Sequence, residues 1–141
     1  MNTLFLQEIN WLAVVMGGFA YFALGALWYS KVLFAPRWLA LTKIDASDPA
    51  ATKGMGALML FSFLVILLNV AGLAILQNML QLANTVISGI KLGALTGLCF
   101  GCVGISNSYL YEKRPTGLHF INGGYTFLGN ILAAIIICIW P

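Results

Sequence analysis

Charged residues are scarce in this chain. Asp, Glu, Lys and Arg together make up 8% of the 141 residues, whereas a typical soluble domain carries about 25%. Hydrophobic residues make up 61%. The composition therefore excludes an ordinary globular domain and predicts an integral membrane protein in contact with the lipid bilayer. Because the apolar runs and their connections occupy the whole length, we expect a single membrane domain, 1–141.

Carboxylates are absent from the long apolar runs. Glu8, Asp45, Asp48 and Glu112 all lie at the ends of these runs or in connections. Carboxylates inside a membrane are the usual handles for protons and cations, so a carboxylate-driven exchanger is disfavoured. The single histidine, His119, leaves haem, di-iron and multi-histidine zinc sites without ligands. We therefore expect no metal, no cofactor and no enzyme activity.

A strongly basic surface and a disulfide framework are also missing. The net charge is only +3, and no basic stripe with interleaved aromatic residues appears, so we expect no nucleic-acid partner. The cysteines lie inside apolar runs. Cys99 and Cys102 form a CxxC near the middle of one run, where a thiolate would be poorly solvated. Packing is favoured there over redox or soft-metal chemistry, and the redox state of the pair stays open.

Four apolar runs are long enough to cross a bilayer as helices. We expect spans at about 10–29, 54–76, 88–109 and 120–140, arranged as an all-α, antiparallel bundle of four transmembrane helices. The connection 31–48 is predicted to lie at the interface, with a short helix starting at Pro36. Asp48 is a predicted N-cap for a helix that begins at Pro49. Aromatic residues near the span ends are predicted interface anchors: Trp11, Trp28, Tyr29, Trp38 and Trp140.

Lysine and arginine are distributed unevenly along the chain. Of the seven basic residues, all except Lys91 lie in the connections 30–53 and 111–118. The positive-inside rule predicts that these two loops are cytoplasmic and that both termini lie outside. Lys91 is close enough to a span end for its long stem to reach the outer interface. We expect a multi-pass protein of the plasma membrane, the inner membrane in a bacterium.

Glycines recur every fourth residue in the third run up to Gly101, and one more, three residues later, returns to the same face of the predicted helix. They are Gly89, Gly93, Gly97, Gly101 and Gly104. Such a ladder lets membrane helices approach closely, so the third helix is predicted to be the central packing element, with Thr96 and Asn107 on the same face. The sequence leaves open whether the contact is within one chain or between subunits. We expect a homo-oligomer, with a dimer as the first hypothesis.

Polar residues recur at helical spacing in the fourth run. Asn122, Thr126 and Asn130 are four residues apart, and Tyr125 lies beside them. One interpretation is polar bonding between helices, and the other is a small polar cavity that opens to the cytoplasmic half. The predicted lining comprises Asn107, Asn122, Tyr125, Thr126 and Asn130. The first interpretation indicates a non-transporting structural or partner-binding protein, and the second a small channel or carrier for an unidentified polar or ionic solute.

Two segments resemble a known family. ALGALWYSKVLFAPRW resembles the Gly-x-x-Trp-Tyr-Ser signature of small membrane proteins in the domain-of-unknown-function family 1761, and EKRPTGLHFINGGYTFLG resembles its last loop and helix. The matching positions are Gly25, Trp28, Tyr29, Ser30, Phe34 and Trp38 in the first segment, and Glu112, Arg114, Asn122, Gly124 and Tyr125 in the second. The family often has a histidine where this chain has Thr126. The resemblance implies a four-helix membrane protein and brings no activity or cofactor.

Overall fold

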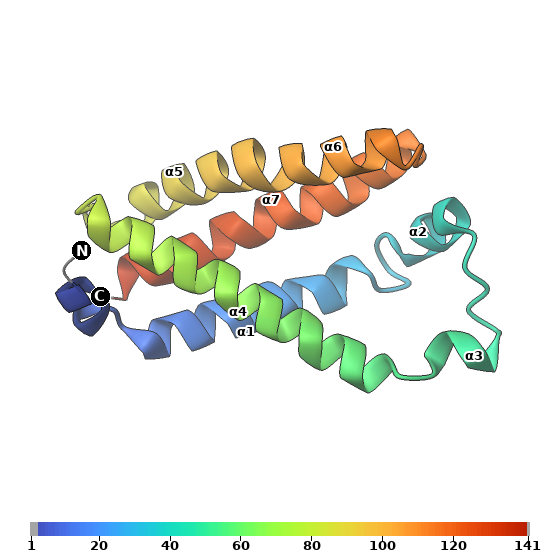
Figure 1. Cartoon of the computed structure of the whole chain (residues 1–141), viewed down its shortest axis with the longest axis horizontal. Helices are drawn as coiled ribbons and strands as arrows, with labels where there is room; N and C mark the ends of the chain where they lie inside the picture. The colour runs from blue at the N-terminus through green and yellow to red at the C-terminus, as the bar shows by residue number, and fades with distance from the viewer. Residues whose placement is uncertain (1–2, 141) are drawn as a thin grey trace.

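The computed structural model describes residues 3–140, and all regular elements in that range are helical (Figure 1). In chain order they are the 3₁₀ helix η1 (Thr3–Glu8), α1 (Trp11–Trp28), α2 (Ala35–Thr42), α3 (Pro49–Thr52), α4 (Met55–Met79), α5 (Val86–Thr96), the π-helix η2 (Gly97–Cys102), α6 (Val103–Tyr111) and α7 (Thr116–Ile139).

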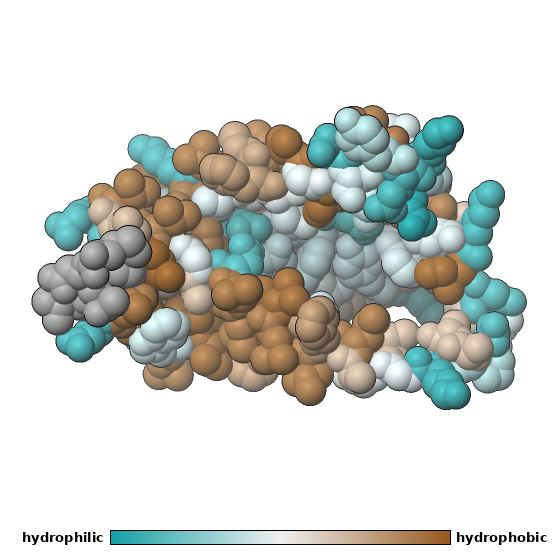
Figure 2. Space-filling model, in the orientation of Figure 1, coloured by the Kyte–Doolittle hydropathy of each residue, from teal (hydrophilic) through white to brown (hydrophobic). Residues whose placement is uncertain are grey.

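Four helical stretches are long and apolar enough to cross a membrane. They are Trp11–Trp28, Pro49–Met79, Val86–Tyr111 and Thr116–Ile139. The shortest has 18 residues, which is about 27 Å at 1.5 Å per residue. Most of their side chains are not buried within the chain, and the exposed ones are largely apolar (Figure 2). The predicted all-α, antiparallel four-helix membrane fold is therefore confirmed, and its exposed apolar faces are compatible with contact with lipid.

Helix α7, rather than the third span, is the central packing element. It packs against α1, α4 and the continuous α5–η2–α6 helix, whereas α4 makes few contacts with α5. Figure 1 shows α4 crossing in front and diverging from α6 toward the end of the molecule where α2 and α3 lie. The core between α7 and its neighbours is formed by small and branched side chains, including Val70, Leu73, Ala133, Ala134 and Cys138. The sequence-based choice of the third span was wrong because α7 also presents small residues to two further helices.

The glycines of α5 let it lie directly on the backbone of α7. A Cβ at Gly89 would be 2.5 Å from the Cα of Ile135, and one at Gly93 would be 2.5 Å from the carbonyl oxygen of Asn130. A Cβ at Gly97 would be 3.0 Å from the Cα of Phe127. These contacts leave no room for side chains. The sequence left open whether the glycine face packs within one chain or between subunits, and along α5 it packs against α7 of the same chain.

The π-helix η2 changes which residues of the following helix α6 face α7. A π turn contains one residue more than an α turn, which rotates the rest of the helix by about 100°. Gly101 still meets the methyl group of Thr126, but a Cβ at Gly104 would have no neighbour within 4 Å. Asn107 is exposed, and Cys102 is turned toward α7, where its Sγ donates to the carbonyl of Gly123 at 3.1 Å. The predicted faces of Gly104 and Asn107 were therefore wrong.

Three of the predicted interface anchors are packing residues. The Nε1 of Trp28 donates to the carbonyl of Ile121 at 2.9 Å, and its ring occupies the space beside Gly124. Tyr29 stacks edge-on against Trp38, with the ring centroids 5.9 Å apart. These three side chains are each only partly exposed. Trp11 and Trp140 do have exposed side chains near the helix ends, as an interface anchor requires.

The connection between α1 and α4 contains the two predicted short helices. Helix α2 has a proline in its first turn, where the missing N–H costs no hydrogen bond. Asp48 caps α3 by accepting from the backbone N–H of Ala50 at 2.9 Å. Both observations agree with the prediction for this segment.

The carboxylate of Glu112 stabilises the turn after α6 through hydrogen bonds, so we expect this stabilisation to depend on pH. Glu112 accepts from Arg114 Nε at 2.9 Å and from Ser108 Oγ at 3.2 Å, and these bonds hold its pKa below the usual value, Arg114 contributing first. We expect Arg114→Ala to raise the pKa of Glu112 in a ¹³C NMR titration. These hydrogen bonds favour the charged form of Glu112. The stability that they add to the turn is therefore present at neutral pH and is lost as the pH falls through the lowered pKa of Glu112.

Asp45 serves as an internal control for that titration. Its pKa is lowered by hydrogen bonds from the side chain and backbone of Ser47, which Arg114→Ala leaves in place. An unchanged Glu112 curve in the variant would show that the ion pair does not form in solution.

Candidate functional site

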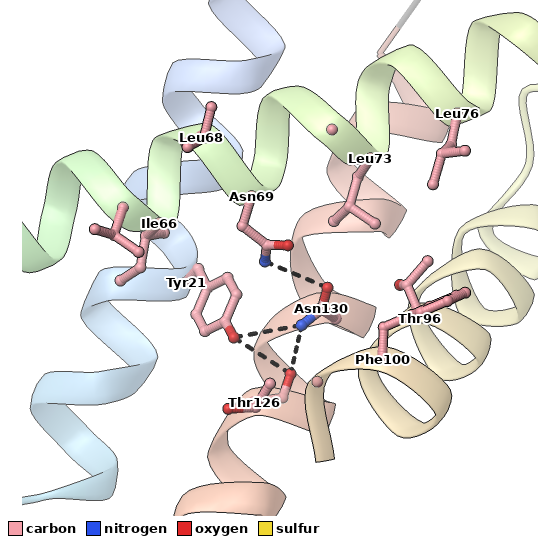
Figure 3. A pocket seen from close by; sticks show the side chains of 13 residues that line it. Tyr21, Ile66, Leu68, Asn69, Leu73, Leu76, Thr96, Phe100, Thr126 and Asn130 are labelled. Carbon is pink, nitrogen blue, oxygen red and sulfur yellow. Dashed lines mark hydrogen bonds between the residues drawn. The ribbon is translucent and has the colours of Figure 1, made fainter. Parts of the chain in front are cut away.

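A group of polar side chains joins three helices halfway along the bundle (Figure 3). Asn130 of α7 donates through Nδ2 to the carbonyl of Thr126 at 2.8 Å and to Tyr21 Oη of α1 at 3.4 Å. Its Oδ1 accepts from Asn69 Nδ2 of α4 at 3.3 Å. Tyr21 Oη also donates to the carbonyl of Thr126 at 3.3 Å. Tyr21, Asn69, Thr126 and Asn130 are called the central polar cluster below.

Local sequence explains how the central polar cluster is held in the interior. The ring of Tyr21 occupies the position that a side chain at residue 129 would take, since a Cβ at Gly129 would overlap it. Tyr21 and Asn130 are 4% and 3% exposed. Polar groups in such a position require hydrogen-bond partners, and the four-residue spacing of Thr126 and Asn130 places the carbonyl of one beside the amide of the other.

The central polar cluster forms the floor of a groove of about 520 Å³ between α4 and the α5–η2 helix. Figure 2 shows this hollow on the side of the bundle, with pale and polar residues between two apolar rims. The walls are largely apolar, and among residues 3–140 no charged side chain lines the groove. The wall residues are Val65, Ile66, Leu68, Gly72, Leu73, Leu76, Thr96, Phe100 and Gly101.

Two polar atoms of the floor have no protein partner. In the described range, no hydrogen bond is made by Asn69 Oδ1 or by Thr126 Oγ1. Asn69 is an exposed residue, and Thr126 Oγ1 is not buried, since Ser30 Oγ is the one buried side-chain polar atom without a partner among the less exposed residues of 3–140. Both residues line the groove, and the amide oxygen of Asn69 offers an acceptor to a molecule that enters it.

A second cavity, of about 340 Å³, lies toward the α2 end. At its centre Tyr29 Oη donates to Asn122 Oδ1 at 2.7 Å, and Asn122 Nδ2 donates to Tyr109 Oη at 2.7 Å. Its other lining residues are Trp38, Ile105, Tyr125 and Thr126. Thr126 lines both the groove and this cavity. We call the second space the tyrosine cavity.

The structure brings most of the predicted cavity residues together. Asn122, Tyr125 and Thr126 line the tyrosine cavity, and Asn130 lines the groove. Asn107 lines neither space, because the π turn puts Tyr109 in the position predicted for it.

Besides Tyr109, sequence reasoning missed three polar members of the two sites. Tyr29 was interpreted only as an interface anchor and Tyr21 was not singled out as a site residue, although both end in a hydroxyl on the α7 side of α1. Asn69 is the one strongly polar residue inside the second span, and that isolation in an apolar run was the available signal.

The two cysteines of the CxxC do not form a disulfide. Cys99 is exposed, Cys102 is partly buried against α7, and Cys138 is buried in the core, all as free thiols. Within residues 3–140, no group of three or more His, Cys, Asp or Glu side chains is placed to hold a metal ion.

The two motif segments, about ninety residues apart, pack against each other. A Cβ at Gly25 would be 2.8 Å from the hydroxyl of Tyr125, and Tyr29 bonds to Asn122. A family model described as "Protein of unknown function (DUF1761)" matches residues 12–138, which includes both segments. No curated protein and no solved structure matches the chain.

Proposed function

The chain belongs to the DUF1761 family of membrane proteins of unknown function, and we propose that it is a carrier for a small uncharged solute. The observation that supports this proposal is that Thr126 lines both the groove and the tyrosine cavity, and that both spaces are lined by hydroxyl, amide and apolar groups. An ionic solute is disfavoured, because neither lining contains a charged side chain that would offset the cost of removing an ion from water.

A carrier is favoured over an open channel by the packing beyond Asn130. On the side of the termini, the interior is filled by buried side chains: Val70, Leu73, Ala133, Ala134, Ile137 and Cys138. A solute that crosses the membrane must therefore pass a closed region, which requires a conformational change.

In this proposal the tyrosine cavity faces the cytoplasm, with loops 30–53 and 111–118 on the same side and both termini outside. The basic residues of these loops support that orientation. That the protein forms a homo-oligomer also stays a prediction. The argument for it from the glycine ladder is weaker, because the glycine face of α5 is covered by α7 of the same chain.

Flux measurements on reconstituted liposomes test the carrier. We expect uptake of at least one neutral solute above that of empty vesicles across a panel of polyols, amides and alcohols. Thr126→Val keeps the methyl group that contacts Gly101 and removes the hydroxyl that both spaces share. Since one hydrogen bond contributes about 0.5–1.5 kcal/mol, flux is expected to fall by roughly three- to tenfold.

Thr42→Val is the matched control for this experiment. Thr42 lies on α2, and its hydroxyl donates to the carbonyl of Trp38 at 2.9 Å, away from both spaces. If the wild-type protein gave only background flux for every solute, the carrier proposal would be contradicted. Equal flux of the two threonine variants would exclude Thr126 from the path.

A second candidate function is a structural or partner-binding protein without transport. It is favoured by the saturation of Asn130, whose amide nitrogen and oxygen are all engaged by α1, α4 and α7. Under this alternative the polar groups hold the helices together, flux stays at background, and Asn130→Leu lowers stability alone.

A further inference from the structure

The polar floor of the groove lies near the middle of the bilayer. Asn69 is 14 residues from Met55 and 10 from Met79, the two ends of α4. These separations correspond to about 21 Å and 15 Å along the helix. Tyr21 and Asn130 occupy similar central positions in α1 and α7. A molecule that reaches this floor must place a polar group at a depth where lipid head groups are absent.

The groove opens to the side rather than to either end. Leu68 and Phe100, on opposite walls, are 75% and 72% exposed, and Figure 2 shows the hollow on the lateral face of the bundle. In a bilayer this face meets hydrocarbon instead of water. A molecule that enters from this side therefore comes from the lipid and needs an apolar tail that matches the walls.

The free atoms of the floor define the polar end of that molecule. Asn69 Oδ1 accepts a hydrogen bond, and Thr126 Oγ1 both donates and accepts. A hydroxyl group on the entering molecule supplies the donor that Asn69 Oδ1 lacks. A phospholipid chain alone would leave both atoms without a partner, and its head group would stay at the interface. A charged group is disfavoured, because the lining holds no opposite charge.

We propose that the groove binds a long-chain lipid alcohol taken up laterally from the bilayer, with its hydroxyl donating to Asn69 Oδ1. This assignment rests on the proposed function, since it names the substrate class of the same site. The hydroxyl lies on the central polar cluster, and the chain lies along the apolar walls of α4 and η2. The tyrosine cavity, which shares Thr126, is the next space open to the hydroxyl group.

Photolabelling in phosphatidylcholine nanodiscs tests this assignment. The probe is a hexadecanol that carries a diazirine and an alkyne, and its matched control has a methyl group in place of the hydroxyl. We expect the alcohol to label peptides within 65–76 and 96–101, which line the groove, roughly three- to tenfold more than the hydrocarbon probe does, since the hydrocarbon cannot donate to Asn69 Oδ1. Equal labelling by the two probes would overturn the assignment.

Two glycines of α4 provide matched variants. Gly72 lines the groove, and neither Gly72 nor Gly56 has a neighbour within 4 Å of an added Cβ. Gly72→Leu therefore fills the groove without displacing the backbone and should reduce labelling by about tenfold, whereas Gly56→Leu should leave it unchanged. Wild-type labelling of Gly72→Leu would show that the alcohol binds elsewhere.

The flux panel separates this inference from the carrier proposal. Flux of a water-soluble neutral solute without hydroxyl-dependent labelling overturns the lipid alcohol and supports the carrier. Labelling of the groove with background flux for every solute, lipid alcohols included, supports the binding site and overturns the carrier. Hydroxyl-dependent labelling together with transfer of the alcohol between vesicles supports both.

Discussion

Gly93→Leu is expected to abolish the native packing of α5 on α7. A Cβ at this position would already be 2.5 Å from the carbonyl oxygen of Asn130 and would overlap the backbone of Ile131. Overpacking costs about 1–3 kcal/mol where side chains can rearrange. Here the obstructing atoms belong to a helix backbone, so we expect a loss of about 3 kcal/mol or more. Thermal denaturation in detergent and size-exclusion chromatography measure the effect.

Gly104→Leu is the control for this substitution. It makes the same change in the same span, but an added Cβ has no neighbour within 4 Å, and we expect native stability. A Gly93→Leu protein that remains folded as a monomer and loses only its oligomers would show that the glycines pack between subunits.

Asn130→Leu has the second largest expected effect, because it removes three hydrogen bonds that connect α7 to itself, α1 and α4. Leucine is similar in size to asparagine, so the loss of stability comes mainly from the missing hydrogen bonds. Such bonds contribute about 0.6 kcal/mol on average within a bilayer and up to about 1.7 kcal/mol. The sum predicts a destabilisation of roughly 2 kcal/mol or more, measurable by steric-trap or denaturant unfolding in micelles.

Asn107→Leu is the matched control, since it exchanges an exposed amide on α6 for the same side chain. We expect it to be neutral or slightly stabilising in a lipid environment. If the two asparagine variants were equally stable, the central polar cluster would contribute nothing to the fold, and both proposed functions would lose their structural basis.

Much of the fold could be predicted because membrane helices are defined by apolar length. The runs around Val14, Ile66 and Ile136 left no other possibility in a chain with so few charges. The site on α7 was also partly predictable, since Asn122, Thr126 and Asn130 share a face whenever that helix is regular. The structure has this helix unbroken from Thr116 to Ile139.

The errors at Gly104, Asn107 and Tyr109 have a common physical origin in η2. The four-residue glycine spacing continues through Gly97 to Gly101, inside η2 itself, and Gly104 follows at the other ordinary helical spacing of three, so the spacing does not indicate a π turn. That turn rotates Asn107 away from α7 and Tyr109 toward it. The role of Trp28 was missed for another reason, because a tryptophan at a span end suits the membrane interface and a tight helix contact equally well.

The groove between α4 and η2 is the feature on which the proposed functions depend most. A density map of the protein in nanodiscs that contain hexadecanol tests it directly. The predicted result is an elongated non-protein density between Leu73 and Phe100 that reaches Asn69 and Thr126. The contradictory result is α4 packed against η2 with no space between them, and with Asn69 Oδ1 and Thr126 Oγ1 bonded to protein groups.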